Sequence, residues 1–121
     1  MRSLSLPALL LLAAGCASTP IPKDKLAVAE QAVQRAEAAG AAEHASGDLA
    51  LAREKLAQAN AAADEETSKA ATEVTRLAEQ SAADARLAEA RAESAKAQKA
   101  VTEMEDGLRA LREEASRPVQ R

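Results

Sequence analysis

Between residues 23 and 117 the chain contains no proline, and its apolar residues recur at alternating intervals of three and four. This spacing places apolar side chains along one face of an α-helix and is typical of helices that pack against one another. The chain has no aromatic residue and alanine is its most frequent residue, so these faces consist mostly of small side chains. Alanine also has the highest helix propensity. The sequence therefore predicts an all-α fold.

The first predicted helix begins at Lys23 and ends between Gly40 and His44. The second begins in the stretch HASGD, residues 44–48, with Ser46 as its N-cap. Each helix has one apolar face with the same alternating spacing. The faces consist of Leu26, Ala29, Val33, Ala36 and Gly40 in the first helix and of Leu49, Ala52, Leu56, Ala59 and Ala63 in the second.

A third helix is expected to begin after residues 64–67, DEET, which offer an N-cap and negative charge for a helix N-terminus. No proline follows until Pro118, which allows roughly 50 helical residues, ~75 Å at 1.5 Å per residue. The alternative to a break before this helix is one continuous helix over residues 49–116. The third helix carries a face of small residues and, on its opposite side, a second face whose side chains become larger toward the end. The small face consists of Ala71, Val74, Ala78, Ser81, Ala85, Ala88, Ala92 and Ala95, and the second face consists of Ala83, Leu87, Ala90, Ser94, Ala97, Val101, Met104, Leu108, Leu111 and Ala115.

Small apolar faces allow helices to approach closely, and heptad spacing favours crossing angles near ~20°. We therefore expect the first two helices to form an alanine-rich antiparallel hairpin on the small face of the long third helix, giving a three-helix, coiled-coil-like arrangement. The larger face would continue beyond the two shorter helices. Burial contributes only ~0.8 kcal/mol per CH₂-sized group, so such a bundle should be marginally stable.

Four aliphatic residues near the end of the third helix form a predicted association surface: Val101, Met104, Leu108 and Leu111. Left uncovered, they would form an apolar stripe of the kind that marks an interface. The alternative is a frayed helix end whose exposed aliphatics need no partner, which Gly107 favours because it costs ~1 kcal/mol of helix stability. The charges that flank these residues are mixed and do not distinguish parallel from antiparallel pairing. A homo-oligomer and a foreign envelope helix both remain open as partners.

Near its start the chain has an apolar segment, residues 4–14, between Arg2 and its only cysteine, Cys16. The segment is about half the ~20 residues that a membrane-spanning helix needs. A preceding charge, a short apolar segment and small residues at its end are typical of a signal peptide. Export leads to an oxidising compartment where cysteines usually pair, so a lone cysteine there is better explained as a chemical handle than as half of a disulfide. The alternative is an ordinary cleaved signal with an incidental cysteine.

Residues 12–16, LAAGC, resemble the lipobox of bacterial lipoproteins, although Ala13 stands where that motif most often has leucine. The resemblance implies cleavage between Gly15 and Cys16, a diacylglycerol on the Cys16 thiol and an acyl chain on its new amino group. Two or more acyl chains anchor a protein stably, at ~0.8 kcal/mol per buried CH₂. Ala17, in place of an aspartate after the cysteine, implies sorting to the outer membrane, with the chain on its periplasmic face.

Two alanine-rich segments, AEAAGAAEHASGDLALAREKLAQA and LAEQSAADARLAEARAESAKA, carry a second resemblance. Over about residues 25–100 the chain is similar to uncharacterised alanine-rich bacterial lipoprotein domains, some of which precede an OmpA-like peptidoglycan-binding domain. The lipid, tether and alanine-rich coil are also similar to murein lipoproteins, which end in a lysine joined to peptidoglycan. This chain ends PVQR and no OmpA-like domain follows, so we expect no direct attachment to peptidoglycan.

The residue types argue against catalysis and against several kinds of ligand. His44 is the only histidine and lies in a predicted turn, and no second histidine or free thiol is available to complete a metal site or a nucleophile pair. The acidic residues 64–66 are better explained as a helix cap than as a cation site, and the glycines form no phosphate loop. The net charge of −3 and the absence of aromatics argue against nucleic-acid binding. We predict a non-enzyme with no metal, no small-molecule substrate and no cofactor apart from the covalent lipid.

Together these patterns divide the chain into a signal peptide (residues 1–15), a lipidated cysteine with its tether (16–22), a helical domain (23–116) and a flexible tail (117–121). The tether's two prolines disfavour helix, and its six residues after Cys16 reach at most ~20 Å, so the helical domain would lie close to the membrane. The favoured function is a lipid-anchored structural or scaffolding lipoprotein that holds a helical rod in the periplasm. The alternative is a periplasmic adaptor that recruits a partner protein or a lipophilic cargo, although a surface without aromatics makes a poor cargo pocket.

Overall fold

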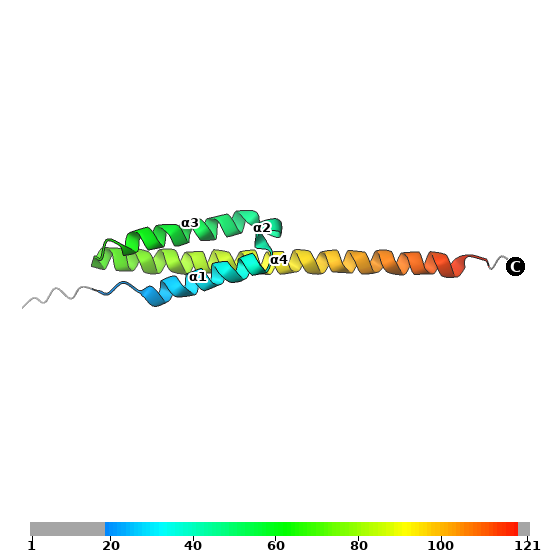
Figure 1. The fold of residues 1–121 in the computed structure, drawn as a ribbon, viewed down its shortest axis with the longest axis horizontal. Helices are drawn as coiled ribbons and strands as arrows, with labels where there is room; N and C mark the ends of the chain where they lie inside the picture. The colour runs from blue at the N-terminus through cyan, green and yellow to red at the C-terminus, as the bar shows by residue number, and fades with distance from the viewer. Residues whose placement is uncertain (1–18, 119–121) are drawn as a thin grey trace, which may run out of the picture.

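The computed structural model describes residues 19–118, which form four α-helices. The helices are α1 (Lys23–Ala38), α2 (Ala41–His44), α3 (Ser46–Ala63) and α4 (Ser68–Ser116). α1 and α4 run in the same direction and α3 runs in the opposite direction (Figure 1). Both shorter helices pack along the first half of α4, which continues alone beyond α2. The predicted all-α class and the long last helix are confirmed, whereas the single turn of α2 is not expected from the sequence.

The core lies where the small faces of α1, α3 and α4 meet. The predicted small faces are buried in the bundle, except that Gly40, Leu56 and Ala63 are partly buried and Ala95 is half-buried at its end. Gly40 also lies past the end of α1, so it is not part of that helix's face. Because most of these side chains end at Cβ, the backbones approach closely and the core is thin. The core consists of Leu26, Ala29, Ala32, Val33, Ala36, Ala41, Ala45, Leu49, Ala52, Ala59, Val74, Leu77, Ala78, Ala82, Ala85, Ala88 and Ala92.

Ser81 is the one buried polar side chain among the described residues. Its hydroxyl donates a 2.7 Å hydrogen bond to the backbone carbonyl of Ala52 in α3. This bond supplies the partner that a buried hydroxyl requires. A side chain as short as serine can reach a neighbouring backbone only where the two helices lie close, so the bond fixes the position of α3 along α4.

The chain breaks between α3 and α4, as predicted, and the alternative of one continuous helix is wrong. α3 ends at Ala63, and Glu66 takes a positive φ of 49° within the turn. Thr67 then caps α4, because its Oγ1 accepts a 3.0 Å hydrogen bond from the backbone N–H of Ala70. The polar DEET stretch thus ends one helix and starts the next.

The connection from α1 to α3 differs from the prediction at Ser46. Ser46 is the first residue of α3, and the N-cap position falls on Ala45, which has no side chain that can cap. The physical reason is burial: Ala45 is only 7% exposed and contributes its methyl group to the core. Its backbone carbonyl still accepts a 3.1 Å hydrogen bond from the N–H of Leu49.

Ion pairs connect the helices at the rim of the core. Lys25 Nζ lies 2.7 Å from Glu79 Oε1, which joins α1 to α4. Exposed pairs of this kind contribute at most about 1 kcal/mol each, so they select which helix faces meet more than they stabilise the fold. The other pairs that join helices are Arg53–Glu37, Arg35–Glu89, Lys55–Asp84 and Arg91–Asp48.

Gly40 is the position where the connection depends on glycine. It takes a φ of +83°, and a Cβ built on it would lie 3.2 Å from Lys96 Cε of α4. Gly40→Ala should therefore lower the free energy of unfolding by ~1–3 kcal/mol, because a left-handed backbone is strained for alanine. Circular dichroism during heating of the chain from residue 17 to 121 measures this effect.

Gly47, inside α3, is the matched control for that variant. A Cβ built there meets no atom within 4 Å, so Gly47→Ala should raise the stability by up to ~1 kcal/mol through helix propensity. If both variants shift the melting temperature in the same direction, the assigned role of the left-handed turn at Gly40 is wrong.

Candidate functional site

The predicted site residues fall into two groups. Gly15 and Cys16, the predicted cleavage and lipid-attachment residues, lie outside the described residues, and their roles stay predictions. The predicted association residues Val101, Met104 and Leu108, together with Leu111, lie on α4 beyond the bundle. We call these four residues the association face.

The second half of α4 extends past the other helices as a single helix. Ala92 is its last buried residue, Ala95 is half-buried, and every described residue from 96 onward is exposed. We call residues 96–116 the arm, which at 1.5 Å per residue is about 30 Å long. Figure 1 shows the arm continuing in a straight line beyond α2.

The association face is the apolar side of the arm. Val101 is 49% exposed, Met104 62%, Leu108 52% and Leu111 68%. These fractions are high for large aliphatic side chains, and their alternating spacing aligns them along one side of the helix. The arrangement can bury these side chains against another helix, whereas it brings no pair of catalytic groups together.

Two ion pairs involve charged residues of the arm. Arg109 lies 3.2 Å from Asp106, and Arg117 lies 3.0 Å from Glu114, both at a spacing of three residues. Sequence spacing also suggests an ion pair between Glu105 and Arg109, but Arg109 pairs with Asp106 instead. The carboxylate of Glu105 is therefore available beside the association face.

The start of the described chain lies at the end of the bundle opposite the arm. Ile21 packs against the core, and Pro22 precedes the first turn of α1. Thr19 and Lys23 line one surface pocket together with Glu66 from the α3–α4 turn. Residues 19–22 and the tip of the arm thus mark the two ends of the described part of the chain, which is elongated (Figure 1).

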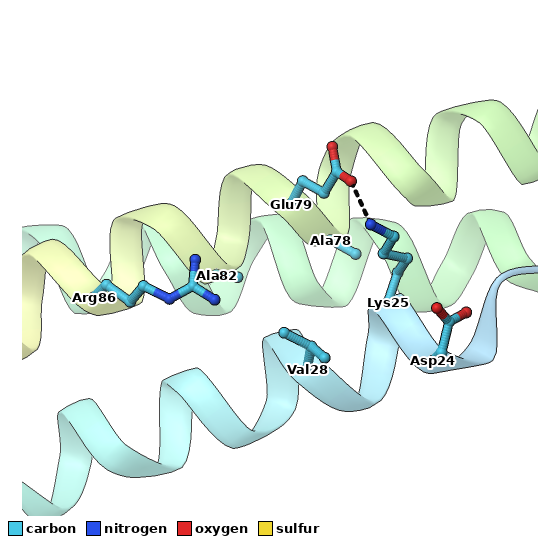
Figure 2. Close-up of a pocket in the computed structure, with 7 residues that line it drawn as sticks. All are labelled: Asp24, Lys25, Val28, Ala78, Glu79, Ala82 and Arg86. Carbon is cyan, nitrogen blue, oxygen red and sulfur yellow. Dashed lines mark hydrogen bonds and ion pairs between the residues drawn. The ribbon is translucent and has the colours of Figure 1, made fainter.

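A groove between α1 and α4 is a further surface feature that sequence spacing does not reveal. It has a volume of about 320 Å³, and Val28, Ala78 and Ala82 form its apolar part. Figure 2 shows Lys25 bonded to Glu79 at one side and Arg86 at the other. The Glu79 carboxylate accepts this hydrogen bond and raises the pKa of Lys25. Acidic and basic groups both line the groove, so its charge favours neither anionic nor cationic ligands.

Two further pairs of titratable groups lie close together within single helices. Arg76 forms an ion pair with Glu73, three residues earlier on α4. The hydrogen bond from Arg76 lowers the pKa of Glu73, and the pKa of Arg76 is raised in return. His44 lies on α2, not in a turn, with its Nε2 3.8 Å from Glu43 Oε2. Within residues 19–118, no three His, Cys, Asp or Glu side chains gather closely enough to hold a metal ion.

Three-helix packing with a protruding, apolar-faced arm defines an elongated helical domain without a built catalytic centre among the described residues. Residues 24–104 match the family described as a domain of unknown function, DUF4398, and the chain belongs to that family. No curated protein and no solved structure matches the chain. Over the part of the chain that the structure describes, none of the helices combines the length and apolarity needed to span a bilayer.

Ser81 and Ser94 test whether the two faces of α4 have different roles. Ser81→Leu should unfold or strongly destabilise the bundle, because it removes the hydrogen bond to Ala52 and overpacks a fully buried contact between α3 and α4, at a cost of several kcal/mol. Ser94 is exposed on the opposite face of the same helix. Ser94→Leu should therefore not lower the melting temperature. Thermal unfolding followed by circular dichroism compares the two variants, and equal destabilisation by both would contradict the assignment of the two faces.

Proposed function

We propose that this chain is a lipid-anchored structural lipoprotein of the cell envelope, which holds a helical rod at the periplasmic face of the outer membrane and associates through its arm. The single observation that carries the proposal is the position of Cys16 directly after the apolar segment, in the sequence LAAGC. In this proposal the lipid determines where the protein is located. The helical rod and the arm determine what it contacts.

The shape of the folded region supports this function. Its first described residues lie at one end of the bundle and the arm lies at the other (Figure 1). A lipid on Cys16 would be joined to the bundle by six residues, which reach at most ~20 Å. The membrane would therefore lie beside one end of the rod, and the association face would lie several nanometres away along α4.

The second candidate is a periplasmic adaptor that recruits another protein. The bare association face favours it, because α1 and α3 leave these aliphatic side chains uncovered. The two candidates differ in what contacts the arm. Crosslinking in intact envelopes distinguishes them, since a dominant self-crosslink favours the scaffold and a dominant crosslink to a different protein favours the adaptor.

Replacement of the proposed lipid-attachment residue tests the anchor. Cys16→Ser should leave the chain unacylated and uncleaved by the lipoprotein peptidase, because serine offers no thiol for the diacylglycerol. Mass spectrometry and membrane fractionation measure both changes. Cys16→Ser/Ser18→Cys is the control, since it restores one thiol two residues from the cleavage site and should not restore the lipid. An unlipidated Cys16→Ser chain that still matures and fractionates with the outer membrane would overturn the anchor.

A further inference from the structure

We propose that a second copy of this chain packs antiparallel along α4, so that the arm of each copy covers the bare side of the other copy's bundle. This inference deepens the proposed scaffolding function by naming the partner of the arm. It rests on that function for the orientation at the membrane, whereas the pairing itself requires no lipid.

The surface that pairs is longer than the association face. The same alternating spacing continues backward along α4 through Ala90 and Leu87 to Ala83. Leu87 is 43% exposed although its neighbours Ala85 and Ala88 are fully buried against the other helices. The bare side therefore runs without interruption from Ala83 in the bundle to Ala115 in the arm, and we call it the pairing stripe. It spans more than four heptads, about 48 Å at 1.5 Å per residue, a length typical of coiled coils.

Side-chain size suits one antiparallel register of the pairing stripe. When Leu87 faces Leu111 of the second copy, three further layers follow at heptad spacing, and two-fold symmetry repeats each layer. These layers pair Ala90 with Leu108, Ser94 with Met104, and Ala97 with Val101. A small side chain lies opposite a large one in each of these three layers, so their volumes are similar. The register also joins two large side chains at Leu87–Leu111 and two small ones at Ala83–Ala115.

The flanking charges select the same register. It brings three pairs of opposite charge together, each twice by symmetry: Arg86 with Glu114, Arg91 with Glu105, and Asp84 with Arg112 of the second copy. Flanking pairs of this kind determine which partner and which orientation a coiled coil accepts. The four residues of the association face alone do not include Asp84, Arg86 or Arg91, which explains why the arm by itself does not choose an orientation.

Other registers place like charges together. A shift of one heptad in one direction brings Arg91 beside Arg112 and Glu93 beside Glu114 of the second copy, and the opposite shift brings Asp84 beside Glu105. A parallel pair in register places Arg86 beside Arg91 of the other copy. Like charges at facing positions are destabilising.

Neighbouring helices hold two of these groups in place. Arg91 pairs with Asp48 of α3, and Asp84 pairs with Lys55 of α3. In the proposed dimer, Arg91 and Asp84 would each lie between a group of opposite charge on α3 and one on the second copy. The Arg91 side chain is still 57% exposed and remains accessible to a carboxylate of the second copy. α1 and α3 occupy the other side of α4, so the second copy displaces neither helix.

The pairing has a geometric consequence for the anchor. The first residues of the two α4 helices would lie about 93 Å apart, at opposite ends of the paired rod. Both tethers can then reach one membrane only when the rod lies along its surface.

Cysteine crosslinking of the full chain in intact envelopes tests the register. Two tagged copies, one carrying Leu87→Cys and the other Leu111→Cys, should crosslink to each other with a short thiol-specific reagent. Leu111→Cys alone should not crosslink, because the two equivalent residues would lie about 36 Å apart. Self-crosslinking of Leu111→Cys at the yield of the mixed pair would overturn the antiparallel arrangement, and the absence of any crosslink would overturn self-association. Modification of the unaltered chain by one molecule of the same reagent would show that the Cys16 thiol is free, which contradicts the proposed lipid anchor but not the pairing.

A charge exchange in the two cysteine variants distinguishes the proposed pairing from nonspecific association. Arg86→Glu should reduce the mixed crosslink roughly tenfold, because it places two like-charge contacts in the dimer. Arg86→Glu/Glu114→Arg should restore the yield, since it only exchanges the two charges of the pair. Glu113→Arg is the control, because Glu113 lies away from the stripe. Failure of the exchange to restore the yield would overturn the proposed register.

Discussion

The close approach of three helices through small side chains is the constraint on which the rest of the structure depends. The largest fully buried hydrophobic side chains are Leu49 and Val74, and most of the core is alanine. Because such faces bring backbones together, a serine hydroxyl can reach across from α4 to the carbonyl of Ala52. The same narrowness lets α1 and α3 lie side by side on one part of α4. The remaining side of α4 is left bare.

Because the core is thin, features at its edges determine which arrangement of the helices is favoured. Alanine burial contributes little free energy per residue, and many alternative alignments of alanine faces would bury similar areas. The positive φ of Gly40, the Thr67 cap and the ion pairs between helices each favour one arrangement. Each contribution is small. The Thr67 cap and the backbone of Gly40 determine locally where helices begin and turn, and the ion pairs between helices form only in the observed order and register. This is how an alanine-rich chain can still have a single fold.

The proposed function depends on the two ends of the bundle and on one side of α4 more than on a pocket. The described N-terminal residues and the arm occupy opposite ends. Five of the seven exposed large aliphatic side chains of the described residues lie along the pairing stripe of α4. An anchor at one end and an association surface along the length are the requirements of a scaffold. The α1–α4 groove carries mixed charge and a small apolar part, and the proposed scaffold function does not depend on it.

The sequence by itself determined the helical class, the apolar faces of all three long helices and the break before α4, because these follow from local spacing, capping and the absence of proline. It also identified the four residues of the association face, which are exposed because α4 is much longer than α1 and α3. Only the tertiary structure decided that Ala45, not Ser46, takes the N-cap position of α3, that α2 forms, and that Arg91 and Asp84 pair with α3. The ion pairs join residues that lie far apart in the chain, and the N-cap position depends on the burial of the Ala45 methyl group in the core. Local spacing carries no information about such contacts, since it records the faces of single helices and not the distance or rotation between them.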